Sequence, residues 1–173
     1  MEDFDKLKEE KNRVLENEEM TKRIVKVGIK YDGASENIPR RQTKFSSGMD
    51  VCAYIKEGGW IDIPPRETVL IKTGMYLDIP KGYEVHIRGR SGMAIRDGIL
   101  CHYGTIDSDY HDEVGIILHN TTNEEFTIYD KNRIAQMFIQ PVYNIEWNFV
   151  SDAQFELSKK NTRNGGFGST GKT

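Results

Sequence analysis

The chain has 173 residues, a formal net charge of −3 and two cysteines. A chain of this length fits one domain that buries about two thirds of its unfolded surface. The near balance of charge and the lack of any stretch close to the ~20 apolar residues of a membrane span argue against nucleic-acid and membrane partners. Cys52 and Cys101 form no CxxC pair, which favours a reduced, cytoplasmic protein with inert, buried thiols.

Residues 1–22 form a charged N-terminal extension dominated by Glu and Lys. Helix is the best interpretation, although its apolar stripe is sparse. It can be a frayed extension, a packed accessory helix or a partner-binding handle, and we favour the first.

Residues 23–160 have the texture of an all-β domain. Val25, Val27 and Ile29 alternate with polar or small residues, which predicts a strand. Many short strands separated by turn formers, without helical patterns between them, predict an all-β barrel or sandwich. The further predicted strands are Met49–Ile55, Thr68–Lys72, Tyr83–Arg88, Val114–Leu118, Phe126–Tyr129 and Ile134–Val142.

The most informative stretch is Gly104–Asn120. Its polar middle predicts the head of a hairpin, with Ile106 and Val114 on paired strands. A solvated surface hairpin is the plain alternative. Asp107 at a strand end and Tyr110 in the turn favour a ligand site, because a carboxylate, an aromatic face and exposed backbone suit a nucleoside. Glycines 104 and 115 flank the turn and let a ligand approach the backbone.

Three further places carry polar groups suited to binding. Asp50 lies at the apolar start of a strand, where a turn aspartate is the plain alternative. Arg90-Ser91-Gly92 combines a guanidinium, a hydroxyl and small-residue amides, which suits an anion. Gln136 lies inside an apolar strand and therefore needs a partner in the core or on a ligand.

Residues 161–173 form a Gly-rich tail that ends in Gly-Lys-Thr and fits the P-loop expression. A P-loop needs a preceding strand and a following helix, and this sequence offers neither, so we reject that interpretation. A mobile segment that folds over a bound phosphate and ring is the alternative that we favour.

Taken together, these motifs resemble the five ordered motifs of the trimeric dUTP pyrophosphatases (dUTPases), over roughly residues 24–171. The resemblance rests on Gly48-Met49-Asp50, Arg90-Ser91-Gly92-Met93-Ala94, 104–120, Arg133-Ile134-Ala135-Gln136, and Arg163 with 165–171. It implies a homotrimer of jelly-roll-like β-barrels that hydrolyses dUTP to dUMP and pyrophosphate, with each site built from different chains.

The resemblance also implies a role for each matching residue. Asp107 would deprotonate the attacking water, and Tyr110 would stack on the deoxyribose. Asp50 would hold Mg²⁺ through water. The expected backbone contacts to uracil come from Gly104, Thr105, Ile106 and Gly115. The expected phosphate contacts come from Arg90, Ser91, Gly92, Gln136 and Arg163. The closing tail would cover the bound nucleotide with Phe167, Gly168 and Ser169.

This sequence departs from the family pattern at two turns. His111-Asp112 stands where Arg-Gly is usual, and Lys131-Asn132 where Gly-Asp is common. We expect Asp112 to adopt a left-handed or nearby conformation, because Asp tolerates that region, and His111 to face solvent.

Two other functions remain open. A dCTP deaminase of the same fold would release ammonia instead of pyrophosphate. A dUTPase-like regulatory protein that senses nucleotides would use the N-terminal extension and residues 31–47 as partner surfaces.

Overall fold

The computed structural model describes residue 11 and residues 24–159. The predicted N-terminal helix and the Gly-rich tail lie outside the described residues. The chain divides into two compact units, Met1–Val142 and Tyr143–Thr173. The first contains every strand of the description, and the second contains helix α2 (Asp152–Lys159), which the sequence did not predict.

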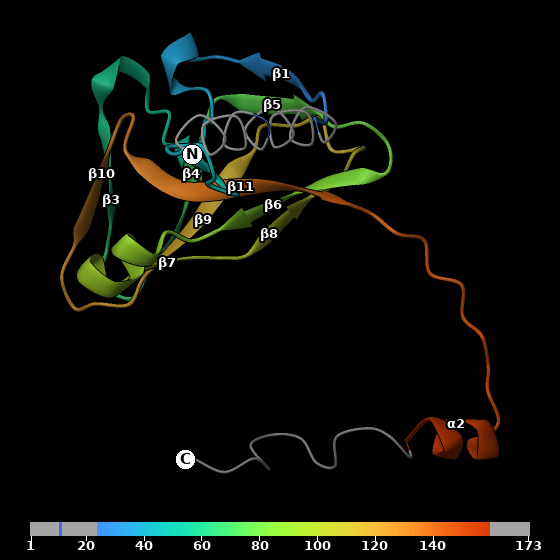
Figure 1. The fold of residues 1–173 in the computed structure, drawn as a ribbon. Helices are drawn as coiled ribbons and strands as arrows, with labels where there is room; N and C mark the ends of the chain where they lie inside the picture. Colours follow the sequence, from blue (N-terminus) through green and yellow to red (C-terminus); the bar gives the residue numbers. More distant parts are fainter. Residues whose placement is uncertain (1–10, 12–23, 160–173) are drawn as a thin grey trace, which may run out of the picture. The chain divides into compact units, whose positions relative to one another are not determined.

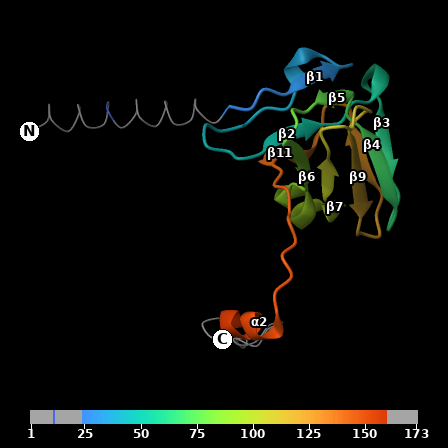
Figure 2. The same cartoon turned by 90° about the vertical axis from the view of Figure 1, so that its right-hand side faces the viewer.

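The first unit is built from antiparallel strands that form four small sheets in the described residues (Figures 1 and 2). The largest has the order β2 (Met49–Cys52), β11 (Arg133–Pro141), β6 (Tyr83–Arg88), β8 (Gly104–Ile106). The second has the order β4 (Thr68–Lys72), β9 (Gly115–Asn120), β7 (Ile99–Cys101). The two pairs are β1 (Gly28–Tyr31) with β5 (Met75–Asp78), and β10 (Phe126–Tyr129) with β3 (Trp60–Ile63). This architecture confirms the predicted all-β, jelly-roll-like fold.

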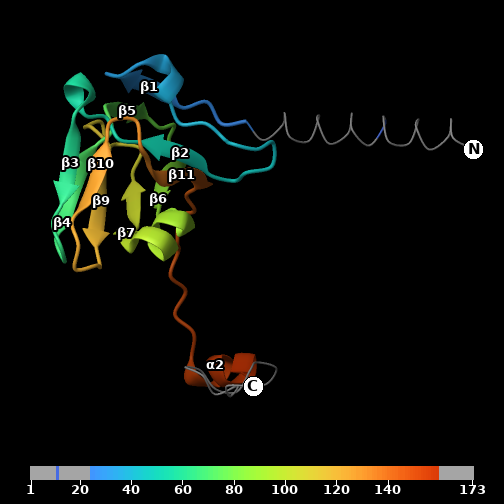
Figure 3. The same cartoon turned by 90° about the vertical axis from the view of Figure 1, so that its left-hand side faces the viewer.

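Three short helical segments join the strands. They are the 3₁₀ turns η1 (Ser35–Asn37) and η2 (Lys56–Gly58) and the π-helical segment η3 (Met93–Asp97). Figure 3 shows η3 close to the lower ends of β6 and β7. None of the described helices is long and apolar enough to span a membrane.

The core consists of alternate residues from strands of different sheets. Val85 and Ile87 on β6 are buried, whereas Glu84 and His86 between them are only partly buried. Ile116 and Leu118 on β9 repeat the pattern from the other sheet. Each such side chain contributes about 1.5–3 kcal/mol on burial, and the period of two therefore fixes which face of each strand turns inward.

The predicted hairpin at Gly104–Asn120 is wrong. β8 pairs with β6, whereas β9 pairs with β4 and β7, so the segment after Ile106 crosses from one sheet to another. The N–H of Val114 donates to the carbonyl of Met75 at 2.8 Å, which places it beside β5. Turn formers between two apolar runs suit both a hairpin and a crossover, and only pairing with distant strands distinguishes them.

The expected left-handed conformation of Asp112 is also wrong. Among the described non-glycine residues, only Arg66 and Lys131 have positive φ, at 64° and 66°. The unusual backbone therefore lies at the other departure from the family pattern, in the turn before β11. His111 is exposed, as expected.

Candidate active site

Asp50, Gln136 and Arg90 lie together at one edge of the largest sheet. The side-chain amide of Gln136 donates to Asp50 Oδ1 at 3.0 Å, and Nε of Arg90 lies 3.9 Å from the same oxygen. Asp50 is only 6% exposed. A buried carboxylate needs such partners, because an unpaired charge away from water is strongly unfavourable.

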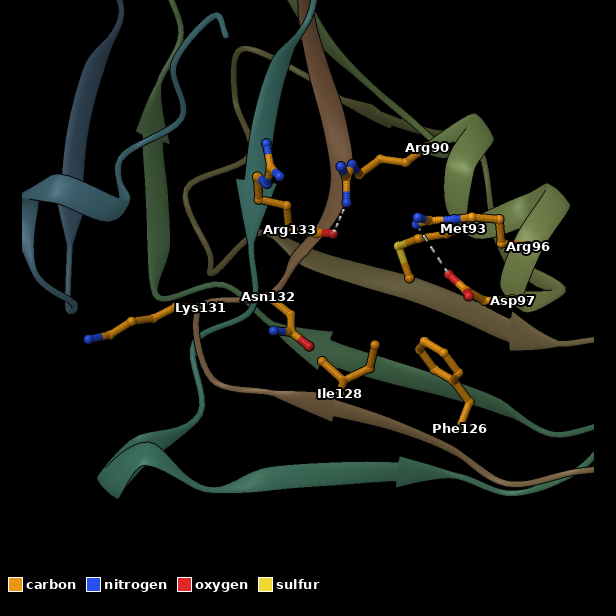
Figure 4. A pocket seen from close by; sticks show the side chains of 9 residues that line it. All are labelled: Arg90, Met93, Arg96, Asp97, Phe126, Ile128, Lys131, Asn132 and Arg133. Atoms are coloured by element: carbon orange, nitrogen blue, oxygen red, sulfur yellow. Dashed lines mark hydrogen bonds and ion pairs between the residues drawn. The ribbon is translucent and has the colours of Figure 1, made fainter.

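Arg133 completes this cluster, although no local pattern in the sequence predicts a role for its side chain. Its Nη1 donates to Asp50 Oδ2 at 3.1 Å, and its carbonyl accepts a bond of 2.6 Å from Arg90 Nη1 (Figure 4). We call Asp50, Arg90, Arg133 and Gln136 the Asp50 cluster.

A bulge in β11 explains why both Arg133 and Gln136 reach Asp50. In a regular strand, residues three apart point to opposite faces. The pairing of β11 with β2 shifts register between Arg133 and Ala135, and the extra residue turns both side chains to the same side. The sequence signal was the cation ahead of an apolar strand interrupted by the amides Gln136 and Gln140, but pairing with β2 could not be read from it.

Ser91 and Gly92 follow Arg90 at the start of η3. The carbonyl of Arg90 accepts a bond of 3.1 Å from the N–H of Ala94, so the chain turns at once into the helical segment. Ser91 is exposed. Its hydroxyl and the first amides of the turn are therefore available to an anion.

The other predicted site residues lie on β8 and just after it. Asp107 is exposed, and its carbonyl accepts a bond of 3.1 Å from the N–H of Tyr110. The Tyr110 hydroxyl donates to the carbonyl of Glu113 at 3.1 Å, and 39% of the residue is exposed. This bond fixes the direction of the ring at the surface.

β8 is an edge strand. It pairs with β6 on one side, and no strand of the described chain pairs with its other side. Edge strands present a row of unpaired N–H and C=O groups. The backbone of Gly104, Thr105 and Ile106 therefore offers donors and acceptors to a flat ligand.

The two glycines that flank this region differ. A Cβ on Gly104 would lie 3.6 Å from Ile87 Cβ, an ordinary contact, so packing does not require glycine there. A Cβ on Gly115 would lie 2.6 Å from Leu70 Cδ1, which gives that glycine a packing reason. Gly104 thus has the stronger case for a role toward a ligand.

The Asp50 cluster and Asp107 are far apart within one chain. In the register of the sheet, Asp50 pairs with Gln136, and Gln136 pairs with Arg88. Asp107 follows Ile106, which pairs with Val85. Three strand spacings across the sheet give roughly 15 Å, and four residues along β6 give roughly 13 Å, so the two carboxylates are about 20 Å apart. A single chain does not bring them to one reacting atom.

Both cysteines lie near these groups and carry protonated thiols at neutral pH. Burial raises the pKa of Cys101 to about 11. Burial, followed by the charge of Asp50, raises the pKa of Cys52. Because the thiolate is the reactive form, the raised pKa values favour the inert thiols that the sequence predicted, although both side chains are only partly buried and not buried as expected. The expected site residues Arg163, Phe167, Gly168 and Ser169 lie outside the described residues.

The fold and the Asp50 cluster define an all-β protein with two arginines and an amide gathered around a buried carboxylate. The dUTPase family model matches residues 34–171. The chain is 45% identical over 147 residues to deoxyuridine 5′-triphosphate nucleotidohydrolase of Finegoldia magna, covering 83% of this chain and 98% of the relative. It is 41% identical to the enzyme of that name from Fusobacterium nucleatum, covering 88% and 100%. The chain belongs to the dUTPase family.

Solved structures support the same fold. The dUTPase of Staphylococcus bacteriophage 80alpha with dUpNHpp superposes with a TM-score of 0.71 at 24% identity, covering 86% of this chain and 99% of that one. A dUTPase from phage phi11 of S. aureus, described for its coordination of a structural Mg(II) ion, gives 0.65 at 22% identity, with 76% and 100% covered.

Proposed function

We propose that this chain hydrolyses dUTP to dUMP and pyrophosphate by attack of water on the α-phosphate. The observation that carries the proposal is the division of polar groups into a cationic cluster that suits phosphates and an edge strand that suits a base. The family match and the relatives named for this activity support it.

The edge of β8 suits recognition of uracil. Uracil presents alternating acceptors and a donor, and the unpaired backbone of Gly104–Ile106 presents the complementary groups. Cytosine has an amine where uracil has O4, so a fixed backbone donor there would face another donor. Mismatched polar pairs of this kind discriminate by ~10⁴ or more.

Asp107 is the residue that we assign as general base. It is exposed beside the edge strand, and no other part of the described chain bonds or pairs with its carboxylate. It can therefore accept the proton of the attacking water. Tyr110, with its ring direction fixed by the bond to Glu113, would stack on the deoxyribose and exclude a 2′-hydroxyl.

The Asp50 cluster would hold the phosphates, with Ser91 and Gly92 contributing a hydroxyl and amides. In the described chain, no three acidic, His or Cys groups come together as a metal cage. Asp50 nevertheless fits Mg²⁺ held through water, because Mg²⁺ keeps several waters and binds through one or two carboxylates plus substrate phosphates. The carboxylate retains lone pairs beyond those used by Arg133 and Gln136. When bound, the ion would neutralise charge on the phosphate oxygens.

We also propose a homotrimer with sites shared between chains. The distance of about 20 Å between Asp50 and Asp107 supports sharing, because motifs of two chains are needed for one site. In the described part of the second unit, the four most exposed apolar side chains call for a partner in the same way. They are Tyr143 at 82%, Ile145 at 72%, Trp147 at 80% and Phe149 at 98%.

The tail residues Arg163, Phe167, Gly168 and Ser169 would close the site over the γ-phosphate and the base. The free, protonated thiols of Cys52 and Cys101 support a reducing, cytoplasmic compartment.

The test is to incubate the protein with each dNTP, dUTP and Mg²⁺, and to measure pyrophosphate and ammonia. We expect pyrophosphate from dUTP alone. The Asp107→Asn variant should lose ~10²–10⁴ in turnover, the usual loss for a general base, while it still binds dUpNHpp. Ammonia from dCTP would instead indicate a deaminase, and near-normal turnover by Asp107→Asn would remove Asp107 from the mechanism.

A further inference from the structure

The segment 107–114, which joins β8 to β9, is tied to the rest of the chain at one place. Within the described residues, every hydrogen bond and ion pair that leaves this segment goes to residues 72–75. We call residues 72–75 the β4–β5 turn. Because Asp107 and Tyr110 lie on the segment, its attachment to this turn determines where their side chains stand.

Glu113 makes two of these contacts through its carboxylate. Oε1 accepts a bond of 2.8 Å from the N–H of Gly74, and Oε2 lies 3.3 Å from Lys72 Nζ. Gly74 is buried, and the Glu113 side chain is only 19% exposed. Removal of the carboxylate would leave a buried N–H unpaired, which is costly. The ion pair contributes less, because the Lys72 side chain is 73% exposed and water screens the pair.

The backbone at and after Glu113 joins the same turn to Tyr110. The N–H of Val114 donates to the carbonyl of Met75 at 2.8 Å, and the carbonyl of Val114 accepts a bond of 2.5 Å from Thr73 Oγ1. The carbonyl of Glu113 accepts the bond of 3.1 Å from the Tyr110 hydroxyl. Glu113 therefore contacts the turn with its carboxylate and the tyrosine with its backbone.

The β4–β5 turn is a firm point of attachment. Gly74 has a φ of 66°, and a Cβ on it would lie 2.8 Å from Cδ1 of Tyr54, so the turn requires glycine. The carbonyl of Gly74 also accepts a bond of 2.8 Å from the N–H of Asp32, just after β1. These contacts hold the Gly74 N–H in place for the Glu113 carboxylate.

We propose that Glu113 is a positioning residue for selection of the sugar, because its bond to Gly74 fixes the segment that places the ring of Tyr110. The inference rests on the proposed function, in which this ring excludes a 2′-hydroxyl. Exclusion by contact needs a ring that does not move away, and a misplacement of about 1 Å can cost about 100-fold in a site that depends on geometry. The bond to the buried N–H supplies this rigidity, whereas the exposed pair with Lys72 does not.

The ratio of dUTP to UTP binding in variants at Glu113 tests the proposal. Glu113→Ala should narrow the ratio about tenfold, because the segment loses its bond to a buried N–H and the ring can yield. Glu113→Asp keeps the charge but is one methylene too short, so it should narrow the ratio as well. Glu113→Gln keeps an oxygen for the Gly74 N–H and should keep most of the ratio. Lys72→Met removes only the exposed ion pair and should change the ratio by less than about twofold.

Asp130→Ala is the matched control. The Asp130 carboxylate also accepts a backbone bond, from the N–H of Ile55 at 2.9 Å, but at the turn before β11. This variant should lower the thermal midpoint as Glu113→Ala does, yet leave the ratio unchanged, because any effect on phosphate contacts applies to both nucleotides alike. Hydrogen exchange of residues 107–114 should become faster in Glu113→Ala only, and it measures the attachment without any nucleotide.

The outcomes separate the two proposals. A wild-type chain that does not hydrolyse dUTP would contradict the proposed function. Normal wild-type turnover with an unchanged ratio in both Glu113→Ala and Glu113→Asp would overturn the role of Glu113 alone. Equal narrowing in Glu113→Ala and Asp130→Ala would show that the ratio follows stability, and would also overturn that role.

Discussion

Lys131 has a backbone conformation that most side chains avoid. Its φ is 66°, and the turn is held by the bond of 3.1 Å from the N–H of Asn132 to the carbonyl of Tyr129. The N–H of Lys131 also donates to the carbonyl of Ala53 at 3.0 Å, which ties the turn to the end of β2. Surrounding bonds therefore impose the conformation on this residue.

Lys131→Gly should raise the free energy of unfolding by up to about 1 kcal/mol. Relief of left-handed strain stabilises the fold by about 1–2 kcal/mol, and the greater freedom of glycine in the unfolded chain offsets part of it. Denaturant unfolding measures the change. Lys131→Ala is the matched control, since it removes the same side chain but keeps Cβ, and it should bring no gain. Equal stability of the two variants would show that the turn is unstrained.

Tyr110 should decide the preference for deoxyribose. If its ring packs against C2′, Tyr110→Ala should narrow the ratio of dUTP to UTP binding, because the hydroxyl then meets no ring. Tyr110→Phe keeps the ring and loses only the bond to Glu113, so it should keep most of the ratio. Binding of both nucleotides to each variant is the measurement. An unchanged ratio in Tyr110→Ala would assign the exclusion to another residue.

At the scale of single residues, the sequence predicted which residues belong to the candidate site better than it predicted which of them contact one another. Asp50, Arg90 and Gln136 were selected separately, and they do meet in the Asp50 cluster. Arg133 was missed because its role depends on a bulge, which follows from pairing with β2 and not from any local pattern. Positive φ was expected at Asp112, but Lys131 has it. The sequence could not distinguish the two turns, because both contain polar residues that tolerate this conformation.

At the scale of elements, strands with clear alternation were predicted with their bounds. β6 and β10 agree to the residue because their apolar residues recur at every second position. β4 also agrees, because its apolar run Val69-Leu70-Ile71 is bounded by polar residues. β3, β5 and β7 were missed, because they are short and owe their conformation to distant partners such as β10, β1 and β9. The same dependence on distant pairing explains the wrong hairpin after β8.

Two glycines should separate a packing role from a ligand role. A Cβ on Gly48 would lie 2.7 Å from Cζ of Phe138, so Gly48→Ala should lower the free energy of unfolding by about 1–3 kcal/mol, as overpacking does. Gly104→Ala meets only an ordinary contact with Ile87 and should unfold like the wild type, so weaker binding of dUpNHpp by this variant would assign the glycine a role toward the ligand.

Thermal unfolding and dUpNHpp titration of both glycine variants give the comparison. A Gly104→Ala protein that binds normally would show that the ligand does not approach β8 there. A Gly48→Ala protein of unchanged stability would show that the ring of Phe138 has room to move.

At the scale of the whole molecule, the single chain holds the two halves of the proposed site without joining them. Asp107 and the Asp50 cluster are about 20 Å apart on one sheet. The sequence resemblance implied shared sites, but no pattern in the chain gives the distance, which depends on the strand order β2, β11, β6, β8. The separation turns the proposed trimer from an accessory property into a condition for activity.

Mixing two inactive variants tests this condition. Asp107→Asn lacks the base, and Arg90→Ala lacks a phosphate contact, so each should be inactive alone. If each site takes Asp107 from one chain and Arg90 from another, random mixed trimers should regain about one quarter of wild-type activity, because half of the chains at each of the two positions are intact. Co-refolded mixtures are compared with each variant refolded alone and with the two mixed after refolding, which should both stay inactive. Mass spectrometry verifies that mixed trimers form, and mixed trimers without activity would place Asp107 and Arg90 of one site in the same chain.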